Sequence, residues 1–98
     1  MKSLTPAQRQ HLKGLAHGLQ PVVMIGSQGL TPAVLKEIER SLAAHELIKV
    51  KAASDEAETR RAWMEAICAE TGAASVQQIG KILVIYRQAA KPVIPLPV

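Results

Sequence analysis

Residues 21–52 read PVVMIGSQGLTPAVLKEIERSLAAHELIKVKA, and this stretch decides the fold class. Pro21–Ile25 is a short apolar run typical of a buried strand, and the tight loop Gly26–Gly29 ends it. Thr31-Pro32 then opens a helix, because threonine suits the N-cap and proline the first helical position. The apolar residues of this helix recur with a helical period: Val34, Leu35, Ile38 and Leu42. Leu47–Ala52 alternates apolar and polar residues and predicts a second strand, so the stretch is a β-α-β unit with parallel strands.

A helix precedes this unit. The run Thr5-Pro6-Ala7-Gln8 has the residues of a capping box, with Thr5 as the N-cap and Gln8 at the third helical position. We expect Gly18 to end the helix, since glycine is the usual residue just beyond a helical C-terminus. Its leucines should share the side that packs on the core: Leu12, Leu15 and Leu19.

A third helix and a hairpin follow the β-α-β unit. Ser54-Asp55-Glu56 places acids in the first turn of a helix that should end at Gly72. Val76–Ile79 and Ile82–Arg87 predict two further strands. Gly80-Lys81 joins them, a two-residue loop with glycine first, as a type II′ hairpin requires.

The predicted order is therefore α-β-α-β-α-β-β, an α/β sandwich over a mixed sheet of four strands. A chain of 98 residues fits one small domain, which we place at residues 1–90. Residues 91–98, KPVIPLPV, are rich in proline and cannot donate a regular ladder, so they predict an extended tail.

The charge balance favours a polyanionic partner. Twelve Lys and Arg against eight Asp and Glu leave a net charge of +4, and a basic surface on so small a protein suits nucleic acid. Aromatic residues make up only 2% and phenylalanine is absent, so the chain cannot build the base-stacking platform of an RRM or an OB-fold. Nucleic acid would then be held mainly through phosphates, sugars and backbone shape.

Several other classes are excluded by the sequence. The single cysteine, Cys68, rules out an intramolecular disulfide and a Cys-based zinc site. The polar N-terminal stretch is not a signal peptide, and no apolar run approaches the ~20 residues of a membrane span. The histidines (His11, His17, His45) have neither metal-ligand spacing nor a nearby carboxylate cluster. We expect a cytoplasmic protein with no catalytic residues, metal, cofactor or membrane contact.

The loop Gly26-Ser27-Gln28-Gly29 is the first candidate site. Two glycines let a backbone pass close to a phosphate, and the helix that starts near Thr31 points free N–H groups at the same place. A KH domain clamps a nucleotide backbone with a loop of this type. The alternative is an ordinary strand-to-helix turn that needs glycine for its dihedral angles.

Basic residues form the other candidates. Arg9, Lys13 and His17 recur at every fourth position of the first helix, which contains no acid to offset their repulsion. Lys49 and Lys51 share one face of a strand, about 7 Å apart. A solvated helix face and an edge strand protected by lysine are the alternatives. Two further basic residues are single candidates for nucleic-acid contact: Lys81 at the hairpin tip and Arg87 at the end of the last strand.

Four blocks of the sequence carry a family resemblance. The chain resembles the bacterial YhbY-type proteins, which are free-standing CRM (chloroplast RNA splicing and ribosome maturation) domains. The matching blocks occur in register between Leu4 and Arg87: residues 11–17, 26–31, 46–51 and 79–87.

The resemblance implies a fold similar to the C-terminal domain of translation initiation factor 3. It also implies RNA binding and association with ribosomal RNA in precursors of the large ribosomal subunit. The family's Gly-x-x-Gly loop corresponds to Gly26–Gly29, and its basic surface to Lys13, Lys49 and Lys51. Many members carry a basic residue inside the loop, whereas this chain has Ser27 and Gln28.

Two hypotheses follow. The first is a monomeric, non-catalytic RNA-binding module of large-subunit assembly, which contacts the RNA backbone through the glycine loop and the basic patch. The second is a protein-interaction adaptor that docks its proline-rich tail on a partner and presents the basic surface to an acidic protein.

Overall fold

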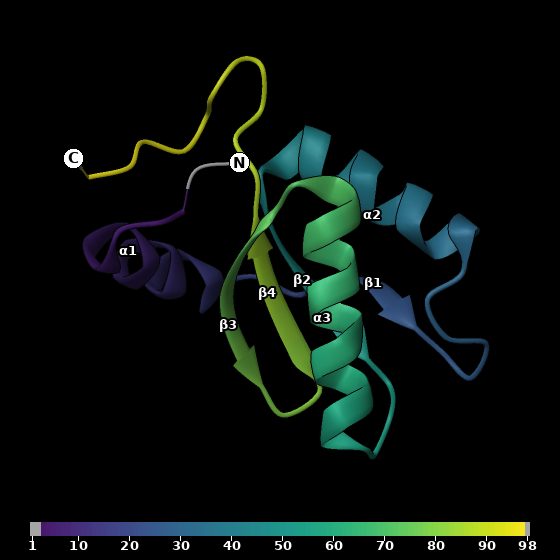
Figure 1. Cartoon of the computed structure of the whole chain (residues 1–98). Helices are drawn as coiled ribbons and strands as arrows, with labels where there is room; N and C mark the ends of the chain where they lie inside the picture. The colour runs from purple at the N-terminus through teal and green to yellow at the C-terminus, as the bar shows by residue number, and fades with distance from the viewer. Residues whose placement is uncertain (1–2, 98) are drawn as a thin grey trace.

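The computed structural model describes residues 3–97, and its elements follow the predicted order (Figure 1). The four strands form one mixed sheet in the order β1-β2-β4-β3, with β1 parallel to β2 and the other pairs antiparallel. The predicted α/β sandwich over a four-stranded mixed sheet is therefore confirmed. The elements are α1 (Pro6–Ala16), β1 (Pro21–Ile25), α2 (Pro32–His45), β2 (Leu47–Ala52), α3 (Ala57–Thr71), β3 (Ala74–Ile79) and β4 (Ile82–Tyr86).

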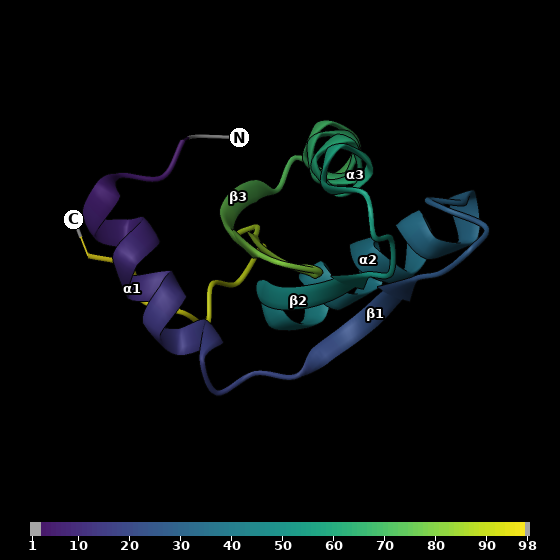
Figure 2. The ribbon, with the colours of Figure 1, turned by 90° about the horizontal axis from the view of Figure 1, so that it is seen from below.

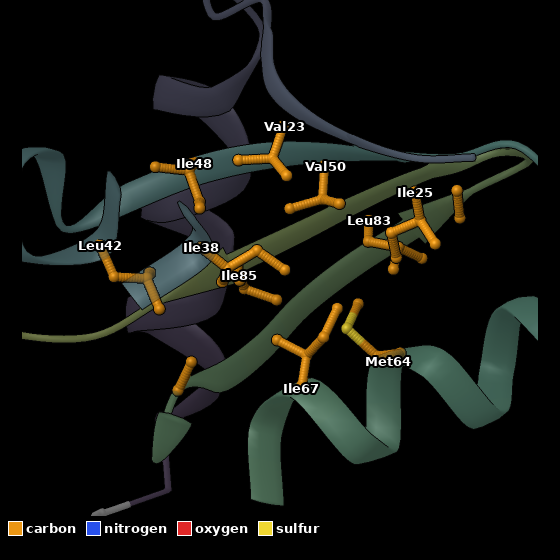
Figure 3. Packing of buried hydrophobic residues seen from close by; sticks show 12 residues of the cluster. Val23, Ile25, Ile38, Leu42, Ile48, Val50, Met64, Ile67, Leu83 and Ile85 are labelled. Atoms are coloured by element: carbon orange, nitrogen blue, oxygen red, sulfur yellow. The ribbon is translucent and has the colours of Figure 1, made fainter. Parts of the chain in front are cut away.

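The main core lies between the sheet and the two helices α2 and α3. Met64 and Ile67 of α3 point towards strand residues such as Ile85 (Figure 3). The predicted apolar side of α2 is confirmed, with Ile38 and Leu42 fully buried. The fully buried part of this cluster is Ile25, Ile38, Leu42, Val50, Ala52, Ile67, Leu83 and Ile85.

A second, smaller core lies under α1 on the opposite face of the sheet. Figure 2 shows α1 and α3 on the two sides of the sheet. Leu12 and Ala16 of α1 pack there against residues of β2, β3 and β4: Leu47, Val76, Val84 and Tyr86. The helix covers only one end of this face, where β2 begins and β4 ends.

The helix starts form as the sequence predicts. Thr5 Oγ1 accepts the N–H of Gln8 at 3.1 Å, and Gln8 Oε1 accepts the N–H of Thr5 at 3.0 Å, which completes the capping box. At the start of α2, Thr31 Oγ1 accepts the N–H of Val34 at 3.2 Å. These bonds satisfy N–H groups that a helix leaves without partners.

The end of α1 lies where the sequence predicts, but one of its leucines does not. The helix ends at Ala16 with His17 as its C-cap, so Gly18 is the residue just beyond its end. Leu15 is 43% exposed rather than part of the core. The reason is that residues four apart lie above one another on a helix, and the sheet contacts the ridge formed by Leu12 and Ala16.

The later boundaries shift by a few residues. Helix α3 starts at Ala57, with Glu56 as its N-cap, and ends as predicted at Gly72, which has a φ of +74°. Strand β3 begins at Ala74, earlier than Val76. Gly80 has a φ of +55°, whereas Lys81 does not have a positive φ, which is the sign pattern of the predicted type II′ turn.

Residues 87–97, which include the described part of the proline-rich tail, contain no helix or strand and fold back beside α1 (Figure 1). Ile94 and Leu96 pack against the α1 core, and Gln8 Nε2 donates to the carbonyl of Pro97 at 3.0 Å. The tail is thus docked on its own domain.

Glu46 anchors this tail. Its fully buried carboxylate accepts the N–H groups of Ala89, Val93 and Ile94 at 2.7, 2.9 and 2.8 Å. Burial by itself would raise the pKa of Glu46, but the three donors lower it, and the pKa lies below its ordinary value of 4.5. The carboxylate is therefore charged at neutral pH and stabilises the docked position of the tail.

Candidate nucleic-acid interface

The glycine loop connects β1 to α2 at one end of the sheet. Its two internal hydrogen bonds run from the N–H of Gly29 to the carbonyl of Gly26 and from the N–H of Thr31 to that of Gly29, both at 3.0 Å. These bonds do not use the N–H groups of Ser27 and Gln28, whose side chains are exposed. The loop can therefore offer backbone donors to an anion beside the positive end of α2.

The two glycines of the loop have different surroundings. Gly29 has a φ of +77°, and a Cβ there would lie 3.9 Å from Trp63 Cζ2. Gly26 does not have a positive φ, and a Cβ there would meet nothing within 4 Å. The turn alone explains glycine at position 29, but this geometry gives no folding reason for glycine at position 26.

Lys49 and Lys51 lie on the sheet face that carries α1. The register pairs Lys49 with Val84 and Lys51 with Ile82, whereas Ile48 and Val50 are buried on the opposite face, as predicted. The edge-strand alternative is wrong, because β2 lies between β1 and β4. The central position of β2 depends on non-local pairing, since β4, which comes later in the chain, pairs with its second edge.

The two lysines differ in how accessible their ammonium groups are. Lys49 is partly buried, and its Nζ donates to the carbonyl of Leu19 at 3.1 Å. Lys51 is exposed and makes no ion pair among residues 3–97. Lys51 is therefore the more accessible cation. Lys49 would have to break its hydrogen bond to Leu19 before it could bind a phosphate.

The basic residues of α1 follow one flank of the helix. At about 100° per residue, Arg9, Lys13 and His17 succeed one another along that flank, and Arg9 Nε and Nη2 donate to the carbonyl of Ser75 at 3.3 Å. Gln8 and Leu15 lie on the other flank, next to the tail. The basic flank therefore borders the part of the sheet that α1 leaves open.

Lys81 lies near the glycine loop, and Arg87 does not. The carbonyl of Lys81 accepts the N–H of Ala52 at 2.7 Å, at the sheet end where the loop begins, and Lys81 Nζ pairs with Asp55 at 2.8 Å. That ion pair holds the pKa of Asp55 below its usual range. Arg87 follows β4 at the opposite end.

Arg87 is engaged inside the fold. Its Nη1 bonds Glu39 Oε2 at 2.7 Å and the carbonyl of Thr71 at 2.8 Å. These contacts tie β4 to α2 and to the end of α3, so Arg87 acts as a structural clamp.

Charge is divided between the two faces. Helix α1 and the four strands contain Arg9, Lys13, Lys49 and Lys51 and no acidic residue. Helices α2 and α3 carry the remaining helical charges, which are mixed in sign: Lys36, Glu37, Glu39, Arg40, Glu58, Arg60, Arg61, Glu65 and Glu70. A polyanion would therefore meet only attraction on the α1 face of the sheet.

The described residues give little support for a metal site, a reactive cysteine or a membrane-spanning helix. Residues 3–97 contain no group of three or more His, Cys, Asp or Glu arranged to hold a metal ion. Burial raises the pKa of the Cys68 thiol, which disfavours the reactive thiolate. Within the same residues, no helix is long and apolar enough to cross a bilayer.

Three strand residues with large apolar side chains are more exposed than the sequence analysis predicts. Val22 and Met24 of β1 are 48% and 59% exposed, and Ile79 of β3 is 53% exposed. The prediction of a buried strand at Pro21–Ile25 is therefore wrong for Val22 and Met24. β1 lies at the edge of the sheet, and the pattern of one strand does not show which face a distant helix covers. The sequence gives one indication of this exposure: no predicted helix on that face is long enough to cover the whole sheet.

Comparison with known proteins agrees with this architecture. The solution structure of a Staphylococcus aureus protein, presented as a candidate RNA-binding protein, superposes with a TM-score of 0.85 at 34% identity, covering 96% of this chain and 99% of that one. The family model of the CRS1/YhbY (CRM) domain matches residues 4–87. The chain belongs to the CRM family. The match covers all seven elements of this CRM domain and ends at Arg87, before the proline-rich tail.

Curated relatives of this CRM domain are named for RNA. An RNA-binding protein of Haemophilus influenzae is 55% identical over 97 residues, covering 99% of this chain and 98% of the relative. A probable RNA-binding protein of Pseudomonas aeruginosa is 44% identical over 90 residues, covering 92% of this chain and 86% of the relative.

Proposed function

We propose that this CRM domain is a non-catalytic RNA-binding module that contacts the RNA backbone through the Gly26–Gly29 loop and the basic α1 face. The observation that carries the proposal is the division of charge, because α1 and the four strands contain no acid and the sheet leads into the loop. The names of the relatives support RNA as the polyanion.

The glycine loop would position one phosphate. The N–H groups of Ser27 and Gln28 are available, and the loop precedes a helix N-terminus, where a negative charge is favoured. The absence of a folding reason for glycine at position 26 is consistent with close approach of a ligand backbone. Lys51 and Lys81 would flank that phosphate, with Lys13, Arg9 and His17 farther along the α1 flank.

The proposed setting is assembly of the large ribosomal subunit, with ribosomal RNA precursors as the target. The resemblance to YhbY-type proteins supports this setting. Crosslinking the protein to RNA in cells, together with its sedimentation against ribosomal particles, tests it. Reads spread over messenger RNA, with no protein in the particle fractions, would contradict it.

The binding surface is tested by the salt dependence of RNA affinity. Each lost phosphate contact should flatten the plot of log affinity against log salt by about 0.7–0.9. We expect Lys51→Ala to do this with an unchanged thermal melt, because its side chain is exposed. Lys91→Ala, which removes an exposed lysine of the tail, is the matched control and should leave the slope unchanged. Equal salt slopes for the two variants would show that Lys51 is not part of the RNA-binding surface.

The adaptor hypothesis needs a tail that is free to bind a partner. In this structure Glu46 accepts the N–H groups of Val93 and Ile94 in the tail and of Ala89 just before it. The apolar side chains of Ile94 and Leu96 pack on the domain itself. The docked tail therefore favours the RNA-binding hypothesis.

A further inference from the structure

A row of four side chains crosses the open part of the α1 face. The register pairs Met24 with Lys51, Lys51 with Ile82, and Ile82 with Ile79, so one residue comes from each strand. Three strand spacings make this row about 14 Å long. It lies at the sheet end that leads into the glycine loop, because Met24 is followed by Ile25 and Gly26.

The row is apolar at both edges and basic inside. Met24 and Ile79 are 59% and 53% exposed, Ile82 is partly exposed, and Lys51 is exposed between them. Exposed apolar side chains gathered on one face mark an interaction site more often than scattered ones do. The core under α1 reaches this row at Ile82, whereas Met24 and Ile79 lie outside that core and stay exposed.

We propose that this row binds unpaired bases of single-stranded RNA, directly beside the phosphate contact at the glycine loop. The inference rests on the proposed function and adds that the RNA is single-stranded at this site. Side chains on an open sheet can reach base faces only where the bases are not stacked inside a duplex. Met24 and Ile79 then contact base faces, and Lys51 pairs with a phosphate between them.

The charge of the row selects RNA over an apolar protein partner. A protein face that covered Met24 and Ile79 would also bury Lys51, and burying an unpaired charge is costly. No acidic residue of α1 or of the sheet could neutralise Lys51 there. A nucleotide brings an apolar base face and an anionic phosphate together, so it satisfies both parts of the row.

The test compares an intact RNA strand with the same strand made abasic at consecutive positions, which keeps every phosphate. We expect the wild type to bind the abasic strand about tenfold more weakly. Met24→Ser/Ile79→Ser should bind the intact strand about tenfold more weakly than the wild type does, with an unchanged salt slope. It should hardly discriminate between the two strands.

Controls make each result decisive. Val93→Ser removes an apolar side chain that is 68% exposed in the tail, and it should change nothing. A thermal melt checks that the double variant is folded, as expected for exposed positions, and Met24→Gln with Ile79→Gln provides a second variant.

Equal binding of both strands by the wild type would overturn the base contact and leave the backbone proposal standing. Failure of the wild type to bind either strand would overturn the proposed function itself. A sedimenting dimer that the double variant dissociates, with RNA affinity unchanged, would assign the row to a second copy of the chain and overturn the inference.

Discussion

At the scale of single residues, Glu46 combines two unfavourable features that its neighbours offset. Its φ of +66° is disfavoured for a side chain with a Cβ, and its carboxylate is fully buried. The N–H of Glu46 donates to the carbonyl of Leu42, and its own carbonyl accepts the N–H of Arg87, both at 2.9 Å. Together with the three tail donors, these bonds fix one residue between α2, β4 and the tail.

Replacing Glu46 by glutamine should destabilise the protein by about 1–3 kcal/mol at pH 7, because a neutral amide accepts fewer and weaker hydrogen bonds than the carboxylate. Chemical denaturation of both proteins measures the difference. Glu39→Gln is the matched control, since that partly exposed carboxylate accepts only from Arg87. A free energy of unfolding equal to that of the wild type would contradict the anchoring role.

The same carboxylate predicts a pH dependence. Its pKa is lower in the folded protein than the ordinary 4.5, so its stabilising contribution is complete above about pH 4.5 and is lost as the pH falls through the folded pKa. The difference between wild type and Glu46→Gln should therefore shrink on acidification. Asp55, whose pKa is also lowered, acts in the same direction in both proteins and cancels in the comparison. A difference that grows towards low pH would contradict this sign.

At the scale of elements, the glycine loop and the start of α2 act as one unit. The turn from Gly26 to Gly29 aims the chain into the Thr31 cap, and α2 then buries Ile38 and Leu42. The folding role and the ligand-binding role of the two loop glycines can be tested separately, because only Gly29 of the pair has a left-handed φ.

Ser27→Asp should lower RNA affinity tenfold or more, about 1.4 kcal/mol, because its carboxylate would occupy the proposed phosphate position. Stability should hardly change, since an acid near a helix N-terminus is favoured in the free protein. RNA titration beside a thermal melt measures both. If the loop were only a turn, affinity would stay within about twofold.

Two glycine variants serve as controls for that prediction. Gly29→Ala should lower stability by about 1 kcal/mol through its φ of +77°. Gly26→Ala should melt like the wild type and still bind RNA more weakly, because its Cβ would stand in open space at the loop surface.

At the scale of the whole molecule, three layers separate two electrostatic environments. The charged residues of α1 and the sheet are all basic, and the helices on the other face are mixed in sign. Such a division orients a small protein as it approaches a polyanion, so it raises the association rate most at low salt.

Removing the tail should lower stability and spare RNA binding. A chain that ends at Arg87 loses the packing of Ile94 and Leu96 and leaves the Glu46 carboxylate without its donors, at a cost of about 2–4 kcal/mol. Denaturation and RNA titration below the new melting temperature measure the two effects. Loss of RNA affinity in the folded, truncated protein would contradict the placement of the site away from the tail.

Local chemistry explains which parts of this structure were predictable. The capping box at Thr5–Gln8 and the turn at Gly80-Lys81 involve partners within a few residues, and both form as expected. The alternation in Leu47–Ala52 correctly predicted which faces its side chains take.

The unpredicted features depend on residues far apart in the chain. Glu46 finds its donors 43 to 48 positions later, and Arg9 contacts the carbonyl of a residue 66 positions later. Whether Lys49 is free depends on where Leu19 lies after α1 has crossed the sheet. No periodicity within a single segment contains this information.

The contact between Gln8 and Pro97 has a topological consequence. It brings the first turn of α1 and the last described residues to one corner of the molecule, on the side away from the glycine loop (Figure 1). A chain whose entry and exit meet can be inserted into a loop of another protein as a cassette, or closed into a ring by a short flexible linker, at little entropic cost. Fusion partners attached at either end would then project from the same corner and leave the opposite end of the sheet accessible.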